Sequence, residues 1–267
     1  MIYILGASGF LGKKVSKLFN NREKILISSK KKKNSIKTYI FTNYKKKEKW
    51  LQNLKANDIL LILSSPGKGK IEYYEKFKNK IKLFEKAIER NLISKINKEA
   101  KVVFLSSDMV YGNRKTLNYE RSVAKPINEY GRSKKRIEDI LKKRKNHIIL
   151  RLSKIYSNDL KEKTFLSNTI LNLKKKRNVY LFTDQYVHFM EIEEFLKILK
   201  KIIININNLN GIYNLPGKIF DNRYNFIRKK LKEKNITFNP SNLKKISLKN
   251  KNLFLPLRLK MKSRFKF

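Results

Sequence analysis

Short apolar runs alternate with amphipathic stretches along most of the chain. The apolar runs are too short for ordinary helices and are bounded by polar or glycine positions, so they predict strands at 2–5, 25–28, 38–41, 59–64, 102–106, 148–152 and 212–215. Stretches with apolar residues at helical spacing predict helices at 10–19, 45–54, 71–91, 129–143, 191–204 and 224–231. This alternation indicates an α/β protein with a parallel sheet covered by helices on both faces.

The regularity of the pattern varies along the chain, and this predicts how it is divided. Residues 1–160 carry the clearest alternation and are expected to form the main domain, to which 191–215 return with one helix and one strand. Residues 161–190 and 216–267 are expected to form a small interleaved region, and the last 35 residues look irregular and basic. At 267 residues the chain fits one large domain with such an appendage.

A glycine-rich loop, ILGASGFLGKK, follows the first predicted strand and begins the first predicted helix. Gly6, Gly9 and Gly12 would allow a tight turn and a close approach of the backbone to a pyrophosphate at the helix start, where Phe10 and Leu11 also lie. The spacing G-x-x-G-x-x-G differs from the usual G-x-G-x-x-G. Its strand–loop–helix context favours dinucleotide binding over a simple packing turn, and thus a doubly wound sheet of Rossmann type.

The end of the second predicted strand bears on the identity of the dinucleotide. The second strand is followed by Lys30, without the acidic residue that usually holds the ribose hydroxyls of NAD. A basic residue suits a 2′-phosphate, so NADP(H) is favoured, while NAD(H) stays open because lysine is abundant throughout the chain.

Tyrosine and lysine four residues apart are candidates for proton transfer, but the spacing alone is uninformative. Three such pairs occur, about as many as chance predicts, at Tyr74/Lys78, Tyr111/Lys115 and Tyr130/Lys134. Only the pair at 130/134 lies in the sequence EYGRSK, shortly after a strand that ends in Ser107.

These residues resemble the extended short-chain dehydrogenase/reductase family. The resemblance implies that Ser107 holds the substrate oxygen, that Tyr130 donates the proton, and that Lys134 binds the cofactor ribose. Gly131 and Ser133 match the family form Y-G-x-S-K. Lys134 lies one helical turn after Tyr130, so its charge is expected to draw the pKa of the phenol toward neutrality.

Several further stretches resemble the dTDP-4-dehydrorhamnose reductase branch of that family. SSDMVYG, LRLSKIY and TDQYVHF resemble its motifs and would place Asp108, Met109, Arg151, Asp184 and Gln185 at the substrate. The implied reaction is hydride reduction of a 4-keto-6-deoxy nucleotide sugar, as in the building of a surface polysaccharide. A homodimer joined through paired helices is common in the family and is a candidate assembly.

The sequence departs from this branch in ways that leave alternatives open. Met109 stands where the branch has a tyrosine, and Phe189 replaces a proline. The strand at 59–65 ends in LSSPG where the branch has Asn-Ala-Ala, so the resemblance implies that Ser64 and Ser65 line the cofactor. Asp184 and Gln185 fit either substrate contacts or a capped turn. A nucleotide-sugar 4-epimerase or dehydratase that retains NAD is the first alternative, with Asp108 as the candidate additional acid.

The formal charge of +44 raises a different class of function. It fits a nucleic-acid-binding scaffold that senses a dinucleotide without catalysis. The lysines are spread over the whole chain and not gathered in one arm, so solvated faces are the favoured interpretation and nucleic-acid binding is not expected. With no cysteine and two histidines, no metal site is expected. No apolar run approaches a membrane span and no signal peptide is recognised, so a cytoplasmic location is expected.

Overall fold

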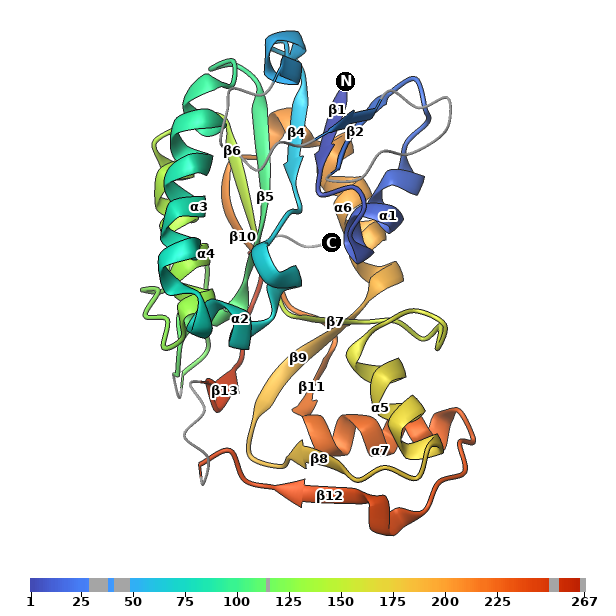
Figure 1. Cartoon of the computed structure of the whole chain (residues 1–267). Coiled ribbons are helices and arrows are strands. Elements are labelled where there is room, and N and C mark those ends of the chain that lie inside the picture. Colours follow the sequence, from blue (N-terminus) through green and yellow to red (C-terminus); the bar gives the residue numbers. More distant parts are fainter. Residues whose placement is uncertain (29–37, 41–48, 114–115, 250–254, 265–267) are drawn as a thin grey trace.

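The computed structural model describes residues 1–28, 38–40, 49–113, 116–249 and 255–264. The expectation for Lys30 lies outside these residues. Figure 1 shows a main domain built on a large sheet and, below it, a smaller region made mostly from the second half of the chain.

Seven parallel strands form the large sheet. Their order is β10-β6-β5-β4-β1-β2-β3. Their bounds are β1 Ile2–Leu5, β2 Lys24–Ser28, β3 Thr38–Ile40, β4 Ile59–Ile62, β5 Lys101–Ser107, β6 His147–Leu152 and β10 Gly211–Leu215. At the centre, Leu5 of β1 is in register with Ile27 of β2 and Ile62 of β4. This arrangement confirms the predicted doubly wound sheet of Rossmann type.

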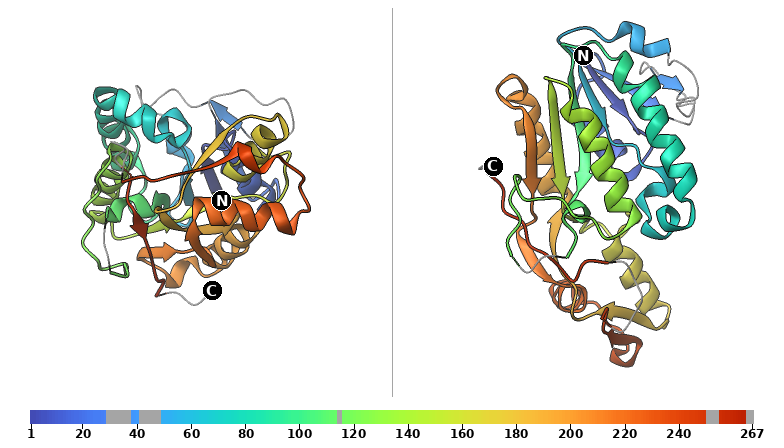
Figure 2. Two further views of the ribbon diagram at one scale, coloured as in Figure 1. Left: turned by 90° about the horizontal axis from the view of Figure 1, so that it is seen from below. Right: turned by 90° about the vertical axis from the view of Figure 1, so that its left-hand side faces the viewer.

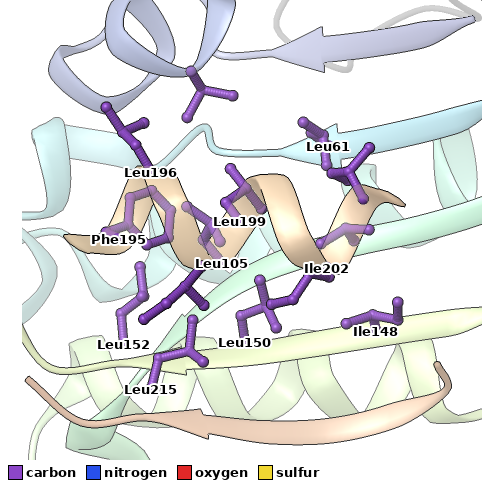
Figure 3. Close-up of a cluster of buried hydrophobic side chains, with 14 of the residues drawn as sticks. Leu61, Leu105, Ile148, Leu150, Leu152, Phe195, Leu196, Leu199, Ile202 and Leu215 are labelled. Atoms are coloured by element: carbon purple, nitrogen blue, oxygen red, sulfur yellow. The ribbon is translucent and has the colours of Figure 1, made fainter. Parts of the chain in front are cut away.

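Helices cover both faces of this sheet, because its strands are apolar on both sides. Helices α3 (Lys78–Asn91) and α4 (Glu129–Lys142) lie on one face, and α1 (Phe10–Val15) and α6 (Ile192–Ile204) lie on the other (Figures 1 and 2). Figure 3 shows how Phe195, Leu199 and Ile202 of α6 pack on the sheet side chains Leu105 and Leu150. Burial of this apolar area is the main stabilising contribution to the fold.

The long helix expected over residues 71–91 is interrupted at Phe77. Helix α2 (Ile71–Lys76) ends there and α3 begins at the next residue, because Phe77 has φ −118° and ψ 43°. Helical hydrogen bonds still bridge the bend, from the Phe77 amide to the Tyr73 carbonyl at 3.0 Å. The bend matters for the site, because Tyr74 of α2 contacts Tyr130 of α4.

The smaller region contains two further sheets that the sequence did not predict. In one, β9 (Tyr186–Glu191) pairs with β7 (Lys154–Tyr156), β11 (Ile219–Asn222) and β13 (Arg258–Leu259). In the other, β8 (Val179–Phe182) pairs with β12 (Leu243–Ile246). Helices α5 (Phe165–Lys174) and α7 (Arg223–Glu233) complete the region.

Two sequence-based expectations change here. The second sheet begins at β7, before residue 160, and the last 35 residues contain β12 and β13 and are therefore not simply irregular. Phe189, which stands where the related branch has proline, stacks on Phe226 with ring centroids 3.8 Å apart and belongs to the core of this region.

Among the described residues, no helix has the length and apolar character needed to cross a bilayer.

Candidate active site

The candidate residues gather at the carboxyl edge of the large sheet. Gly6 follows β1, Ser64 follows β4 shortly after its end, Ser107 ends β5 and Ser153 follows β6. The strand order reverses direction between β1 and β4, and ligands of doubly wound sheets bind at such a switch point. Topology therefore places the glycine loop and the candidate catalytic residues around one edge.

The glycine loop is packed so tightly that two of its positions require glycine. Gly6 has φ +95°, and a Cβ there would lie 2.8 Å from the Ser64 nitrogen. A Cβ on Gly12 would lie 2.1 Å from the Gly6 carbonyl oxygen and 2.7 Å from Cα of Ala7. These contacts hold the start of α1 directly against the end of β1.

The third glycine leaves room on the outer side of the loop. Gly9 is exposed, and a Cβ there would meet only the Gly6 carbonyl oxygen, at 3.3 Å. Gly9 caps α1 without a side-chain acceptor for the first-turn amides. First-turn amides that no side chain caps, beside an open glycine, fit the pyrophosphate of a dinucleotide. Phe10 and Leu11, in contrast, pack partly against the sheet core.

The loop after β4 connects the glycine loop to Tyr130. The Ser64 backbone touches Gly6, and the Ser65 hydroxyl hydrogen-bonds to the Tyr74 hydroxyl at 2.7 Å. The rings of Tyr74 and Tyr130 meet edge to face with centroids 5.1 Å apart. The two serines therefore lie between the expected cofactor loop and the candidate proton donor.

Local packing at the start of α4 sets the position of Tyr130. The Asn128 side chain caps the helix by accepting from the Gly131 amide at 2.7 Å. A Cβ on Gly131 would lie 2.4 Å from the Met109 carbonyl oxygen, so only glycine lets α4 approach the turn at Asp108–Tyr111 this closely. Met109 thus contacts the helix cap through its carbonyl, and its thioether accepts from Asn128.

The structure brings Ser107, Tyr130 and Lys134 together. The Ser107 hydroxyl donates to Asp108 Oδ1 at 3.0 Å and also forms a hydrogen bond that lowers the pKa of Tyr130. The buried Lys134 ammonium donates to the Leu105 carbonyl at 2.8 Å and lies 5.7 Å from the centroid of the Tyr130 ring. The hydroxyl of Ser107, the phenol of Tyr130 and the ammonium of Lys134 therefore lie close together.

The electrostatics of this group differ from the expectation. Burial, with a contribution from the negative charge of Asp108, raises the pKa of Tyr130 to about 12. Burial also lowers the pKa of Lys134 to about 8, although Glu138 opposes this shift. The pKa of the phenol is therefore raised and not drawn toward neutrality as expected, and the group that opposes the shift is Ser107. Tyr130 stays protonated at neutral pH, as a proton donor must.

Asp108 is a second titratable group in this cluster. Its side chain is 4% exposed, and burial raises the pKa of its carboxyl to about 6 despite the hydrogen bond from Ser107. Its charge acts on both Tyr130 and Lys154. Asp108 therefore connects the catalytic cluster to the smaller region.

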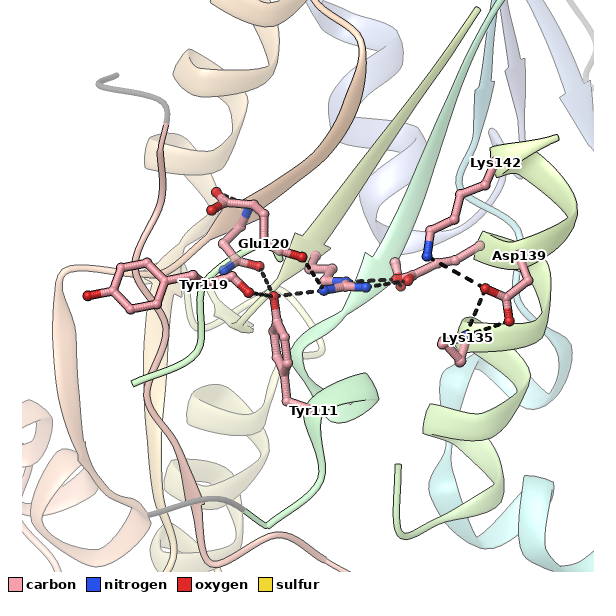
Figure 4. A network of polar contacts seen from close by, with 10 residues as sticks. Tyr111, Tyr119, Glu120, Lys135, Asp139 and Lys142 are labelled. Atoms are coloured by element: carbon pink, nitrogen blue, oxygen red, sulfur yellow. Dashed lines mark hydrogen bonds and ion pairs between the residues drawn. The ribbon is translucent and has the colours of Figure 1, made fainter. Parts of the chain in front are cut away.

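Arg151 lies in a buried polar network. Its guanidinium donates to both carboxylate oxygens of Glu138, at 3.0 and 2.6 Å, and to the Tyr111 hydroxyl at 2.8 Å. Figure 4 shows this network reaching Tyr119 and Glu120. Glu138 lies one turn after Lys134 on α4, so these contacts favour a role in fixing α4 over the expected contact with substrate.

Asp184 and Gln185 also make structural contacts. Asp184 accepts from the Ser247 hydroxyl at 2.6 Å and from the Leu248 amide at 2.7 Å. The fully buried Gln185 side chain donates to the Pro256 carbonyl at 3.0 Å. These contacts fasten the turn between β8 and β9 to the C-terminal segment, and they favour the capped-turn alternative over substrate binding.

Two cations near Asp108 were missed by the sequence analysis. Lys154 begins β7 and Arg223 begins α7, and both interact electrostatically with Asp108. Lys154 lies inside the recognised stretch LRLSKIY, but one lysine carries little signal in so basic a chain. Nothing local in the sequence indicates that Arg223 approaches the site.

The chain is similar to known proteins in both sequence and structure. The family model of the RmlD substrate-binding domain matches residues 1–253, whereas no curated protein matches the chain. A dTDP-4-dehydrorhamnose reductase from Bacillus anthracis, in complex with NADP, superimposes with a TM-score of 0.78 at 19% identity, covering 98% of this chain and 90% of that one.

Two further structures share the fold. A hypothetical dTDP-4-dehydrorhamnose reductase from Sulfolobus tokodaii has a TM-score of 0.78 at 20% identity and covers 97% of this chain and 91% of its own. A dTDP-glucose 4,6-dehydratase from Streptomyces venezuelae, with NAD bound, has a TM-score of 0.77 at 13% identity and covers 98% and 88%. The family match over nearly the whole length shows that this protein belongs to the RmlD substrate-binding-domain family, within the extended short-chain dehydrogenase/reductases, which are NAD(P)-dependent enzymes.

Proposed function

We propose that the protein reduces a 4-keto-6-deoxy nucleotide sugar by hydride transfer from NADPH or NADH, with Tyr130 as the proton donor. The observation that carries the proposal is the convergence of Ser107, Tyr130 and Lys134 beside a glycine loop whose outer side is open. We expect the reaction to take place in the cytoplasm, and a homodimer remains a candidate assembly.

The cofactor supplies the hydride when bound, and the chain handles the proton. Gly6, Gly9 and Gly12 would hold the pyrophosphate, with Ser64 and Ser65 beside the nicotinamide half. The Ser107 hydroxyl holds the substrate carbonyl oxygen. Tyr130, protonated because its pKa is about 12, gives its proton to that oxygen as negative charge develops there. The phenolate left behind recovers a proton from solvent.

Lys134 has two roles in this proposal. Its ammonium is anchored on the Leu105 carbonyl, which fixes the side chain one turn from Tyr130. A positive charge there lowers the free energy of the phenolate that forms during proton transfer. A side chain fixed in this place is also available to the cofactor ribose.

A binding experiment tests the cofactor half of the proposal. Purified protein is titrated with NADPH and with NADH at moderate salt, and nicotinamide fluorescence is followed. The matched control is Gly9→Asp, which keeps a favourable helix cap but places a carboxylate where the phosphates would bind. We expect saturable binding that this variant loses. Equal binding by both proteins would exclude the glycine loop as the cofactor site.

A second candidate is a nucleotide-sugar dehydratase or 4-epimerase that retains NAD. The observation that favours it is Asp108, a buried acid whose pKa of about 6 would let it exchange a proton close to Tyr130. The two reactions differ in cofactor balance. A reductase consumes one NADPH or NADH for each sugar converted, whereas a dehydratase or an epimerase converts sugar with no net consumption.

The third alternative, a non-catalytic scaffold, rests on the net charge of +44 alone. It predicts binding to random DNA that weakens steeply with salt, and no turnover of any nucleotide sugar. The buried Ser107, Tyr130 and Lys134 cluster disfavours this alternative, because a scaffold has no use for a desolvated proton donor.

A further inference from the structure

Two cations of the smaller region share one aromatic ring at the junction of the two sheets. The Lys154 ammonium lies 4.9 Å from the centroid of the Phe165 ring, and the Arg223 guanidinium carbon lies 5.5 Å from the same centroid. The three residues begin three different elements, β7, α5 and α7. The fold therefore brings two positive charges together from distant parts of the chain.

Neither cation has an ionic partner among the described residues. Asp108 and the exposed Glu72 act on both through space, but neither carboxylate forms an ion pair with Lys154 or Arg223. The Nε of Arg223 is buried and has no hydrogen-bond partner within the described part of the chain. Half-buried like charges without a partner raise the free energy of the folded state, so this arrangement calls for an anion that the chain does not supply.

The position of the pair relative to the reacting group indicates which anion this is. Asp108 accepts from Ser107 at 3.0 Å, and its charge acts on both Tyr130 and Lys154. One carboxyl group thus interacts with both the candidate proton donor and the cation pair. A sugar that offers its carbonyl to Tyr130 would bring a charged substituent on its ring, or a phosphate on its anomeric carbon, toward Lys154 and Arg223.

We propose that Lys154 and Arg223 bind an oxyanion of the substrate, either a carboxylate carried by the sugar or the phosphate joined to its anomeric carbon. This inference rests on the proposed nucleotide-sugar function and adds a specificity site to it. A carboxylate on the sugar would make the substrate a uronic-acid nucleotide in place of a 6-deoxy one, whereas the phosphate is compatible with either. The planar guanidinium suits two parallel hydrogen bonds to an oxyanion, and the ammonium adds a point charge beside it. The ring of Phe165 holds both side chains in place without neutralising them.

Calorimetric titration of the NADP-loaded protein tests the proposal. The probes are UDP-glucuronic acid, UDP-glucose and UDP, with the thymidine equivalents of the last two, followed by D-glucuronate and inorganic pyrophosphate. The test variants are Lys154→Gln and Arg223→Gln. The controls are Lys200→Gln on α6 and Arg228→Gln on α7, which remove exposed charges elsewhere and correct for the general attraction of anions to a basic protein.

We expect each test variant, but neither control, to weaken binding at least tenfold. Weakening confined to UDP-glucuronic acid and D-glucuronate would identify a sugar carboxylate. Equal weakening for all nucleotides and pyrophosphate would identify the phosphate. Unchanged binding in both test variants would overturn the inference while leaving the proposed function standing.

Failure of the proposed function would look different. In that case the wild-type protein binds no nucleotide or nucleotide sugar, and the two small anions decide the inference. Pyrophosphate or D-glucuronate binding that weakens in Lys154→Gln and Arg223→Gln would support an oxyanion site. Binding of these anions that is unchanged in both variants would reject it. Thermal unfolding of each variant serves as a second readout. Loss of an unpaired cation should not lower the unfolding midpoint, whereas loss of a structural contact should.

Discussion

The candidate catalytic cluster and the cation pair Lys154 and Arg223 differ in how their charges are compensated. On α4, Glu138 is paired with Arg151, and Lys134 donates to the Leu105 carbonyl. In the smaller region, Lys154 and Arg223 share the Phe165 ring with no ionic partner within the described residues. The first arrangement holds reacting groups in place. In our proposal, the second binds an oxyanion of the substrate.

The largest expected effect comes from removing a charge on the compensated side. Arg151→Met removes the ionic partner of the buried Glu138 carboxylate and leaves it with the hydrogen bond from Ser106, so we expect the free energy of unfolding to fall by about 3–5 kcal/mol. Urea denaturation measures this loss. The double variant Arg151→Met/Glu138→Leu removes both charges and should recover much of the stability. A single variant as stable as the wild type would contradict the contrast between the two sides.

The second-largest loss of stability is expected from a substitution in the glycine loop. Gly12→Ala forces a Cβ to within 2.1 Å of the Gly6 carbonyl oxygen, and such overpacking costs about 1–3 kcal/mol of unfolding free energy. Gly9→Ala is the matched control, because Gly9 has φ −72° and an open outer side. We expect it to change stability by less than about 0.5 kcal/mol. Similar losses in the two variants would mean that the loop is not packed as described.

The pH dependence of anion binding tests the proposed role of Lys154 in the cation pair. Burial and the charge of Arg223 lower the pKa of Lys154 to about 7, so its ammonium is charged below pH 7 and becomes neutral above it. Affinity for an anionic sugar nucleotide should therefore fall as pH rises past 7, by up to about tenfold per unit.

Comparison with Lys154→Gln isolates this effect. Asp108, with a pKa of about 6, also becomes negative as pH rises, but in the wild type it is ionised for the most part above pH 7. Titrations at pH 7, 7.5 and 8 should show a steeper decline in the wild type than in the variant. Parallel declines would remove Lys154 from the binding site.

The smallest expected effect has the opposite sign to the first. Lys154→Met removes one of two adjacent positive charges and keeps an apolar stem beside Phe165. We expect the free energy of unfolding to rise by about 0.5–1 kcal/mol at low salt, with less gain at high salt because screening already weakens the repulsion. A clear loss of stability at both salt concentrations would show that Lys154 has a structural partner.

Sequence patterns predicted the large sheet and the grouping of the candidate catalytic residues because their signals are local. Gly6, Gly9 and Gly12 lie within one turn after one strand, and Tyr130 and Lys134 lie on one turn of one helix. Their strand–loop–helix setting is visible without any knowledge of distant contacts, so the fold and the grouping of these residues could be predicted.

The smaller region could not be predicted in the same way. Strand β13 has two residues and β7 has three, and each pairs with β9 across a long stretch of chain. Such short strands carry almost no periodicity. The same limit applies to Arg151, whose motif spacing does not reveal that Glu138 and Tyr111 occupy its guanidinium, and to Arg223, which approaches Lys154 only in the folded protein.

The central claim is that Tyr130 donates the proton in an NAD(P)H-dependent reduction. The most direct test follows NADPH consumption with a panel of 4-keto nucleotide sugars in the wild type and in Tyr130→Phe, with NADPH affinity measured for both proteins. Loss of the phenolic proton should lower kcat by about 10²–10⁴-fold and leave NADPH affinity nearly unchanged. A Tyr130→Phe enzyme that turns over at the wild-type rate would contradict the account.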